Sequence, residues 1–240
     1  MIDIKNGQIA FDNNILISNM NLNIPDNQLS IIIGPNGAGK TSLINVFAGS
    51  AKLSDGCITN TFKKTILIPQ RAYFPEGITL YDYLSSVFFQ SKWKWQLSVC
   101  EKNNIHDILD KLNLENKIDS YLNQLSAGEL QLANIALCIL SGADFIILDE
   151  PSANLDILNE ILILEIIKNL VNKNISVAAV VHDINLAARY GDHFIVVSRK
   201  GYTISGTRDE VLIPKNLSDA YNFDFKMVEI DENIYIQPNI

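Results

Sequence analysis

The residues of this chain that most clearly could do chemistry lie in the segment Gly34-Pro-Asn-Gly-Ala-Gly-Lys40-Thr41. The segment matches the pattern G-x-x-x-x-G-K-[ST], which places glycines and backbone N–H groups around phosphates and a helix N-terminus against the anion. The lysine neutralises the outer phosphates, and the hydroxyl that follows it binds Mg²⁺. A plain glycine-rich turn is disfavoured, because the full pattern is present between an apolar strand and a helix. We predict a phosphate site formed by Gly34, Pro35, Asn36, Gly37, Ala38, Gly39, Lys40, Thr41 and Ser42.

Two adjacent acids end a second apolar segment, Phe145-Ile-Ile-Leu-Asp149-Glu150. Ligands of doubly wound sheets bind beyond the carboxyl ends of the strands. In that position Asp149 would meet the metal through its water shell, and Glu150 would act as the base for a water that faces the γ-phosphate. An acidic pair that only caps a strand before Pro151 is the alternative, and the phosphate loop upstream makes it the weaker one.

A third segment, Ser126-Ala-Gly-Glu129, fits a capping box, with Ser126 as N-cap and Glu129 at the third helical position. Taken alone, it would be an ordinary helix start. However, Leu125-Ser-Ala-Gly-Glu129 lies between a phosphate loop and an Asp-Glu strand, and it resembles the LSGGQ signature of ATP-binding cassette (ABC) proteins. In this order the motifs make nearly the whole chain similar to the nucleotide-binding subunit of an ABC transporter. The resemblance implies that Leu125, Ser126, Ala127, Gly128 and Glu129 bind nucleotide.

The resemblance also gives roles to four residues outside these motifs. Gln70 stands where the family has its Q-loop, which touches metal and attacking water, although alone it would be a strand-end amide. His182 matches the switch histidine that contacts the γ-phosphate, and Asp156 lies in the segment that resembles the D-loop. Asp156 is equally well explained as the N-cap of the next helix. Phe11 stands where an aromatic ring commonly stacks on adenine, and it could as easily be a core residue.

The signature departs from the usual family pattern. Members usually have glycine at the position of Ala127, often glutamine at Glu129, and frequently arginine near Leu130 and Leu132. Ala127 can still donate its backbone N–H, and the Thr41-Ser42 order still offers a hydroxyl to Mg²⁺. Every catalytic position is therefore filled. Without the arginines, however, the signature helix lacks its usual polar contacts, and we expect ATP turnover to be slow.

Strands and helices must position these residues. Short apolar runs alternate with helical patterns along the chain, so we expect an α/β fold with parallel strands buried between helices. The resemblance implies a phosphate-loop sheet core with an N-terminal antiparallel β subdomain and an inserted helical lobe. A single domain over 1–240 would contain that lobe at about 71–125 and a small C-terminal appendage at 202–240. Strands are expected at Ile2–Phe11, Ile15–Ile24, Leu29–Ile33, Thr65–Pro69, Phe145–Asp149, Ser176–Val181, His193–Ser198 and Asn233–Gln237, and helices at Lys40–Ala48, Leu80–Phe89 and Ile105–Leu112.

Composition narrows the function classes further. The 240 residues carry a net charge of −8, which argues against binding nucleic acid or anionic lipid through the overall field. Cys57, Cys100 and Cys138 share no close spacing, so they fit neither a disulfide framework nor a zinc cluster and indicate a reducing compartment. The first residues lack the basic and apolar parts of a signal peptide. Leu130–Leu148 is too polar for a membrane span, so we expect membrane contact only through a partner.

Four further residues match none of the motifs. His106 and His193 fit surface or packing roles, and Trp93 and Trp95 fit packing within the helical lobe better than contact with a partner.

The resemblance implies an ATPase that uses ATP and Mg²⁺, works as a dimer of two copies, and sits at the inner face of the cell membrane on permease subunits. A substrate-binding protein would be an indirect partner. The segments Val181–Tyr190 and Gly206–Val211 resemble importers of ferric siderophores, haem and cobalamin, and iron chelates are our first expectation. Haem, cobalamin or metal-ion import, an iron-sulfur assembly scaffold, and a nucleotide sensor are the alternatives.

Overall fold

The structure is a computed structural model that describes residues 1–11, 14–70, 74–89, 96–153, 155–230 and 233–239. Arg71, at the start of the expected lobe, and Trp93 and Trp95 lie outside the described residues.

The central sheet has the strand order β5-β6-β7-β3-β8-β9, and its strands are parallel except for β9, which pairs antiparallel with β8. β3 lies between β7 and β8, so that Ile31 pairs with Ala179 on one side and with Phe194 on the other. Strands buried on both faces need apolar residues at nearly every position, and these runs supply them. The strands are β3 Leu29–Ile33, β5 Thr65–Ile68, β6 Phe145–Asp149, β7 Ser176–Val180, β8 His193–Val197 and β9 Thr203–Gly206.

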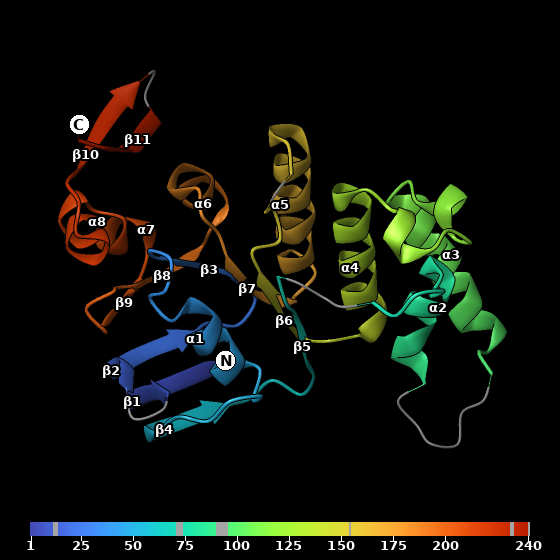
Figure 1. Cartoon of the computed structure of the whole chain (residues 1–240), viewed down its shortest axis with the longest axis horizontal. Coiled ribbons are helices and arrows are strands. Elements are labelled where there is room, and N and C mark those ends of the chain that lie inside the picture. Colours follow the sequence, from blue (N-terminus) through green and yellow to red (C-terminus); the bar gives the residue numbers. More distant parts are fainter. Residues whose placement is uncertain (12–13, 71–73, 90–95, 154, 231–232, 240) are drawn as a thin grey trace.

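Two separate clusters of buried side chains cover the two faces of this sheet. Because side chains alternate along a strand, Ile31 of β3 belongs to the cluster beneath α4, α5 and α6, whereas Ile32 belongs to the cluster beneath α1 and the N-terminal strands. Figure 1 shows α4, α5 and α6 on one side of the sheet and α1 with the N-terminal strands on the other. The helices are α1 Lys40–Phe47, α4 Ala127–Ser141, α5 Ile157–Val171 and α6 Ile184–Tyr190.

The N-terminal strands form an antiparallel sheet of order β2-β1-β4, as the fold expectation requires. Its strands are β1 Ile2–Phe11, β2 Asn14–Ile24 and β4 Asp55–Asn60. β4 was not expected from the sequence. All its residues are exposed, so it lacks the alternation of buried apolar residues that marks a half-buried strand.

The helical lobe contains α2 Leu80–Ser85 and α3 Val99–Lys111, both of which pack against α4. The helix expected at Leu80–Phe89 ends as a 3-10 turn at Ser86–Phe88, and further such turns lie at Glu115–Lys117 and Leu122–Gln124. The second lobe helix begins earlier than expected, because Ser98 and Glu101 form a complete capping box. α4, which follows the expected lobe, packs on both of these helices and also on α5 and β5.

The C-terminal appendage differs from the expected strands and turns. β9 belongs to the central sheet, and two helices follow it, α7 Arg208–Val211 and α8 Pro214–Tyr221. Both are too short for a helical period to be visible, although a Thr207–Glu210 capping box and Pro214 in the first turn mark their starts. A separate hairpin, β10 Phe225–Ile230 and β11 Asn233–Pro238, closes the chain.

Among the helices of the described residues, none combines the length and hydropathy needed to cross a lipid bilayer. The most apolar candidate segment is interrupted after α4, where Gly142 adopts a φ of 65° and ends the helix.

Candidate nucleotide site

The phosphate loop joins β3 to α1 at the carboxyl edge of the central sheet. Gly34 passes so close to β8 that a Cβ there would lie 2.2 Å from the carbonyl oxygen of Val197, so only glycine fits. Gly39, with a φ of 98°, precedes α1 and gives it no side-chain cap. The first N–H groups of α1 therefore remain available to an anion. Within the loop, Pro35 and Ala38 are buried, Asn36 and Gly37 are exposed, and Ser42 lies in the first turn of α1.

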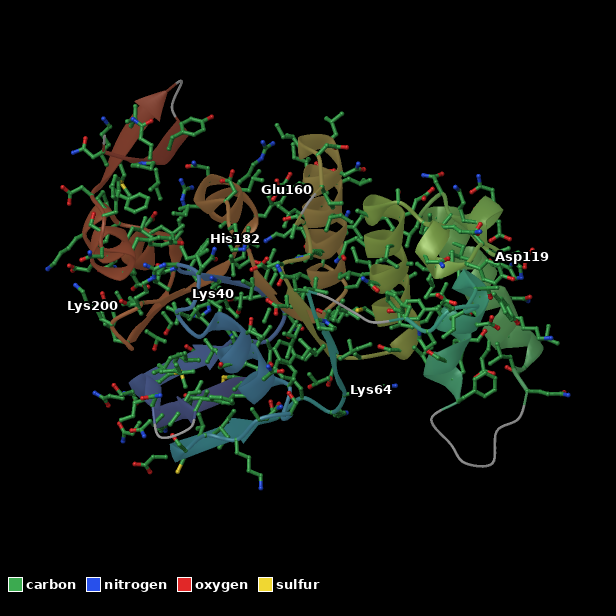
Figure 2. All side chains as sticks on the ribbon, in the orientation of Figure 1. Lys40, Lys64, Asp119, Glu160, His182 and Lys200 are labelled. Atoms are coloured by element: carbon green, nitrogen blue, oxygen red, sulfur yellow. The ribbon has the colours of Figure 1, made fainter. Side chains whose placement is uncertain are left out.

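Lys40 is buried, with 6% of its surface exposed, and its Nζ donates hydrogen bonds to the carbonyl oxygens of Gly34 at 2.8 Å and Pro35 at 3.1 Å. Burial lowers the pKa of the ammonium, and the nearby carboxylates of Glu150 and Asp149 act in the opposite direction. A cation held by neutral carbonyls is poorly compensated, so phosphate oxygens are better partners for it. Figure 2 shows Lys40 near the middle of the molecule, below His182 in this view.

A pair of oxygen ligands suited to Mg²⁺ lies beside the lysine. The Thr41 hydroxyl donates to Asp149 Oδ2 at 3.2 Å, which joins the start of α1 to the end of β6. Burial raises the pKa of Asp149, while the Thr41 hydrogen bond lowers it. Mg²⁺ usually takes one or two protein oxygens and completes its shell with water and substrate phosphates. Among the described residues, no three or more His, Cys, Asp or Glu side chains are grouped so that they could hold a metal ion.

Glu150 is held between two side chains from neighbouring strands. Gln70, after β5, donates from Nε2 to Glu150 Oε2, and His182, after β7, lies with Nε2 at 2.6 Å from Glu150 Oε1. Glu150 itself has a φ of 54°, a left-handed conformation that a non-glycine residue adopts only at a cost. The tertiary contacts maintain it, and they fix a carboxylate at the sheet edge where the phosphate loop begins.

A cavity of about 510 Å³ opens beside this carboxylate, with Gln70, Glu150 and His182 in its wall. Ser152 also lines it and donates from its hydroxyl to Glu160 Oε1 at 2.7 Å, which ties the segment after Glu150 to α5. The cavity has room for a water and for part of a ligand between the acidic strand end and α5.

The signature segment lies apart from the phosphate loop, at the start of α4. Ser126 caps the helix by accepting from the Glu129 N–H at 3.2 Å, and Glu129 accepts from the Ser126 N–H at 2.8 Å. An ion pair of 3.1 Å links Glu129 to Lys117, while Ser126 and Ala127 are exposed. Among the described residues, no hydrogen bond joins Leu125–Glu129 to the phosphate loop.

Two other expected site residues, Asp156 and Phe11, lie outside these clusters. Asp156 caps α5, with its carboxylate accepting from the Asn159 N–H at 2.9 Å, as the local interpretation proposed. Asn159 also lies beside Gly128, 3.5 Å from where a Cβ would stand, so the D-loop and signature regions are neighbours. Phe11 ends β1 with 69% of its surface exposed, which leaves its ring free of the core.

One contact with the phosphate loop was missed in the sequence. Arg199, after β8, donates to the Asn36 carbonyl oxygen from Nε at 3.4 Å and from Nη2 at 3.3 Å. Nothing in the local sequence marks this arginine, because its role depends on β8 lying beside β3 in the sheet.

The family model described as ABC transporter matches residues 17–153. An uncharacterized ABC transporter ATP-binding protein of Methanocaldococcus jannaschii is 31% identical, with 93% of this chain and 92% of that protein covered. The petrobactin import ATP-binding protein YclP of Bacillus subtilis is 27% identical, with 96% of each covered. The chain also superposes on a subunit of an inward-facing transporter assigned to the metal-chelate type, with a TM-score of 0.89. The two sequences are 20% identical, and the match covers 100% of this chain and 97% of that one.

Proposed function

Since this chain belongs to the ABC transporter family, we propose that it is the ATPase subunit that drives uptake of an iron chelate through a membrane permease. The observation that carries the proposal is the arrangement at one sheet edge, where Glu150 is held by Gln70 and His182 next to Lys40 and Asp149. Membership of this family identifies the chain as an ATPase. The residue roles, the dimer and the cargo are proposed below.

Nucleotide binding relies on the loop and the start of α1. Lys40 exchanges its two carbonyl partners for the β- and γ-phosphate oxygens, and the uncapped N–H groups of α1 add donors to the same phosphates. Thr41 and Asp149 hold Mg²⁺, which neutralises charge on the phosphates when it is bound. Phe11, exposed at the end of β1, offers its ring to the base.

Hydrolysis relies on Glu150. Its carboxylate accepts a proton from water while the water oxygen bonds to the γ-phosphorus and the bond from that phosphorus to the ADP oxygen breaks. Gln70 and His182 orient the carboxylate through its two oxygens. In this proposal His182 also contacts the γ-phosphate when nucleotide is bound.

A second copy completes the site in this proposal. A bacterial ABC transporter cassette with 25% identity to this chain and a TM-score of 0.72 was solved as a dimer. Ser126 and Ala127 of the Leu125–Glu129 segment are exposed, and among the described residues no hydrogen bond joins the segment to its own phosphate loop. We assign it to the nucleotide of the partner copy, with Asp156 and its D-loop beside it.

We assign to this chain the transport role that the names of its relatives describe. YclP is a petrobactin import protein, and another B. subtilis relative is an iron(3+)-hydroxamate import protein. Both names describe import of iron chelates, which is the cargo we propose. The chain would sit at the cytoplasmic face of the membrane on permease subunits, and an external substrate-binding protein would deliver the chelate.

Purification of the tagged chain from detergent-solubilised membranes tests the transport role. A permease with several membrane spans should co-purify, and the complex should hydrolyse Mg-ATP faster than the isolated chain. Recovery of the chain with iron-sulfur assembly proteins, and with no permease, would contradict it.

The cargo is tested after reconstitution of that complex in vesicles. Ferric siderophore with its binding protein should stimulate ATP hydrolysis, whereas haem and cobalamin should not. Stimulation by cobalamin alone would keep the ATPase assignment and replace the cargo.

A further inference from the structure

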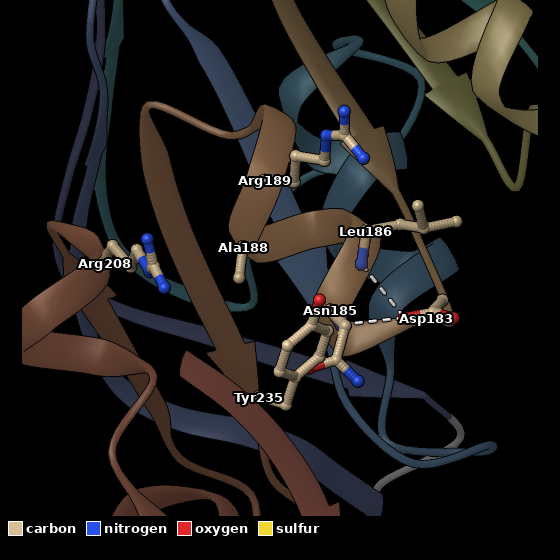
Figure 3. A pocket seen from close by; sticks show the side chains of 7 residues that line it. All are labelled: Asp183, Asn185, Leu186, Ala188, Arg189, Arg208 and Tyr235. Carbon is tan, nitrogen blue, oxygen red and sulfur yellow. Dashed lines mark hydrogen bonds between the residues drawn. The ribbon is translucent and has the colours of Figure 1, made fainter. Parts of the chain in front are cut away.

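A second pocket, far along the chain from the phosphate loop, lies between α6, α7 and β11. It has a volume of about 560 Å³, and Arg189, Arg208 and Tyr235 are in its wall together with Asn185 and Asp183. Figure 3 shows Arg189 and Ala188 on α6, Arg208 on the facing segment and Tyr235 on β11. The size is that of a small-molecule site rather than a flat docking surface.

The two arginines are unusual in this chain. The sequence has four arginines against fifteen lysines, and two of the four line this one pocket. Arg189 lies with its Cζ 5.7 Å from the centre of the Tyr190 ring, which is a cation–π contact rather than an ion pair. Neither Arg189 nor Arg208 makes an ion pair or hydrogen bond with another of the described residues.

The one acidic side chain in the wall is already engaged. Asp183 Oδ1 accepts from the N–H groups of Asn185 at 2.7 Å and Leu186 at 3.0 Å, as the N-cap of α6. Its charge is thus directed to the helix start rather than to the guanidinium groups. In a chain of net charge −8, a pocket with two uncompensated guanidinium groups favours an anion.

Part of the wall depends on how the C-terminal hairpin is attached. The side-chain amide of Asn185 donates to the Ile236 carbonyl oxygen at 3.1 Å and accepts from the Ile236 N–H at 2.8 Å, and Ile236 is buried. This two-way contact fixes β11 on α6 and places Tyr235 in the pocket. A ligand there would touch both the hairpin and the helix that follows His182.

We propose that this pocket binds a small organic or inorganic polyanion whose carboxylate or phosphate groups pair with Arg189 and Arg208. Guanidinium groups bind both kinds of group through paired N–H donors, so the shared feature is at least two oxyanion groups within one small molecule. The volume favours such a molecule over an acidic protein segment.

Calorimetric titration tests the proposal with two probes, tricarballylate as the polycarboxylate and pyrophosphate as the phosphate. The protein is kept saturated with Mg-ADP in excess Mg²⁺, so that the phosphate loop is occupied. At least one probe should bind, and R189Q and R208Q should each weaken it about tenfold or more. The probe that binds identifies the oxyanion group.

Lys215→Gln is the matched control, because it removes an exposed positive charge from α8 without touching the pocket. It should leave probe affinity unchanged, and all three variants should keep the Mg-ADP affinity and melting temperature of the wild type. Bound probe should also slow hydrogen exchange of the Ile236 amide. The proposal is overturned if neither probe binds at millimolar concentration, if K215Q weakens binding as much as the arginine variants, or if only an acidic peptide binds.

Discussion

The phosphate loop and the signature segment both end at the start of a helix, but they treat its N-terminal N–H groups in opposite ways. Gly39 leaves the start of α1 uncapped, whereas Ser126 and Glu129 satisfy the start of α4 with their own side chains. The first helix start is therefore an anion site within one copy. The second is stable without a ligand, and its exposed Ser126 hydroxyl and backbone can serve a nucleotide brought by another copy.

The two starts also differ in charge. A buried ammonium lies beside the start of α1, whereas the start of α4 carries a carboxylate where the family often has glutamine. The N–H of Ser126 and the ion pair with Lys117 lower the pKa of Glu129, so it is ionised at neutral pH. The proposed function therefore places nucleotide binding within one copy and makes turnover depend on the start of α4 in the other copy.

Glu150→Gln should abolish turnover and keep nucleotide binding. Glutamine retains the size and hydrogen bonding of the side chain but cannot accept the proton, and loss of a general base costs about a hundred- to ten-thousandfold in rate. The variant should accumulate as an ATP-bound dimer, visible by size-exclusion chromatography. E165Q, on the exposed face of α5, is the control and should hydrolyse ATP normally. If the Glu150→Gln protein hydrolysed ATP at the wild-type rate, another residue would have to be the general base, and His182 would be the next candidate.

Lys40→Ala should weaken Mg-ATP binding by about ten- to a hundredfold in the isolated chain, because it removes charged hydrogen bonds worth about 1.5–3 kcal/mol. Isothermal titration of the monomer measures the change. Lys52→Ala removes an exposed charge shortly after α1 and should have no effect. Equal affinity of the folded Lys40→Ala and wild-type proteins would contradict the site assignment.

Ser126→Ala should separate folding from turnover when it is compared with Ser98→Ala. Each serine caps a lobe helix in the same way, with a glutamate three residues later, so each substitution should cost about 1 kcal/mol of folding free energy. Chemical denaturation measures this loss. Only Ser126→Ala should also slow ATP hydrolysis, and neither should change ATP affinity of the monomer. If the two substitutions had equal effects on hydrolysis, Ser126 would act only as a helix cap.

Glu129→Gln should raise the ATPase rate by about two- to fivefold, which corresponds to removing a weak, solvent-screened repulsion between a carboxylate and the partner's phosphates. Glutamine can still complete the capping box, so stability should change little. The rate gain should shrink at high salt. A rate that is unchanged or lower would show that the carboxylate lies away from the phosphates in the dimer.

Asp149→Asn should stabilise the nucleotide-free protein slightly at neutral pH. Because the folded pKa of Asp149 is raised, its native state binds a proton more tightly than the unfolded chain, and this contribution to stability is lost as pH rises through the folded pKa. Asparagine is never charged, so the variant does not lose this stability as pH rises. Its melting temperature should therefore exceed that of the wild type most at neutral pH, and the difference should shrink as pH falls towards 3.8. The same variant should bind Mg-ATP more weakly. A gain that grew on acidification would contradict the direction of the shift.

Local patterns account for much of what was predicted. The buried strands Leu29–Ile33 and Phe145–Asp149 were expected with their observed bounds, because continuous apolar runs bounded by turn residues leave few alternatives. The capping box at Ser126 was expected, because it depends on residues only three apart, whereas the same signal at Ser98 was missed. By contrast, β4 is exposed throughout and α7 and α8 are short, so neither burial pattern nor period marks them.

The phosphate loop, the acidic strand end and the start of α4 follow from local sequence, because each depends on neighbours within a few residues. Tertiary structure alone decided that Gln70 and His182 meet at Glu150, since that contact requires β5, β6 and β7 to lie side by side. It also decided the Arg199 contact with Asn36 and the pairing of Arg189 with Arg208 in one pocket. These residues are far apart along the chain, and only the order of the strands and the docking of the hairpin bring them together.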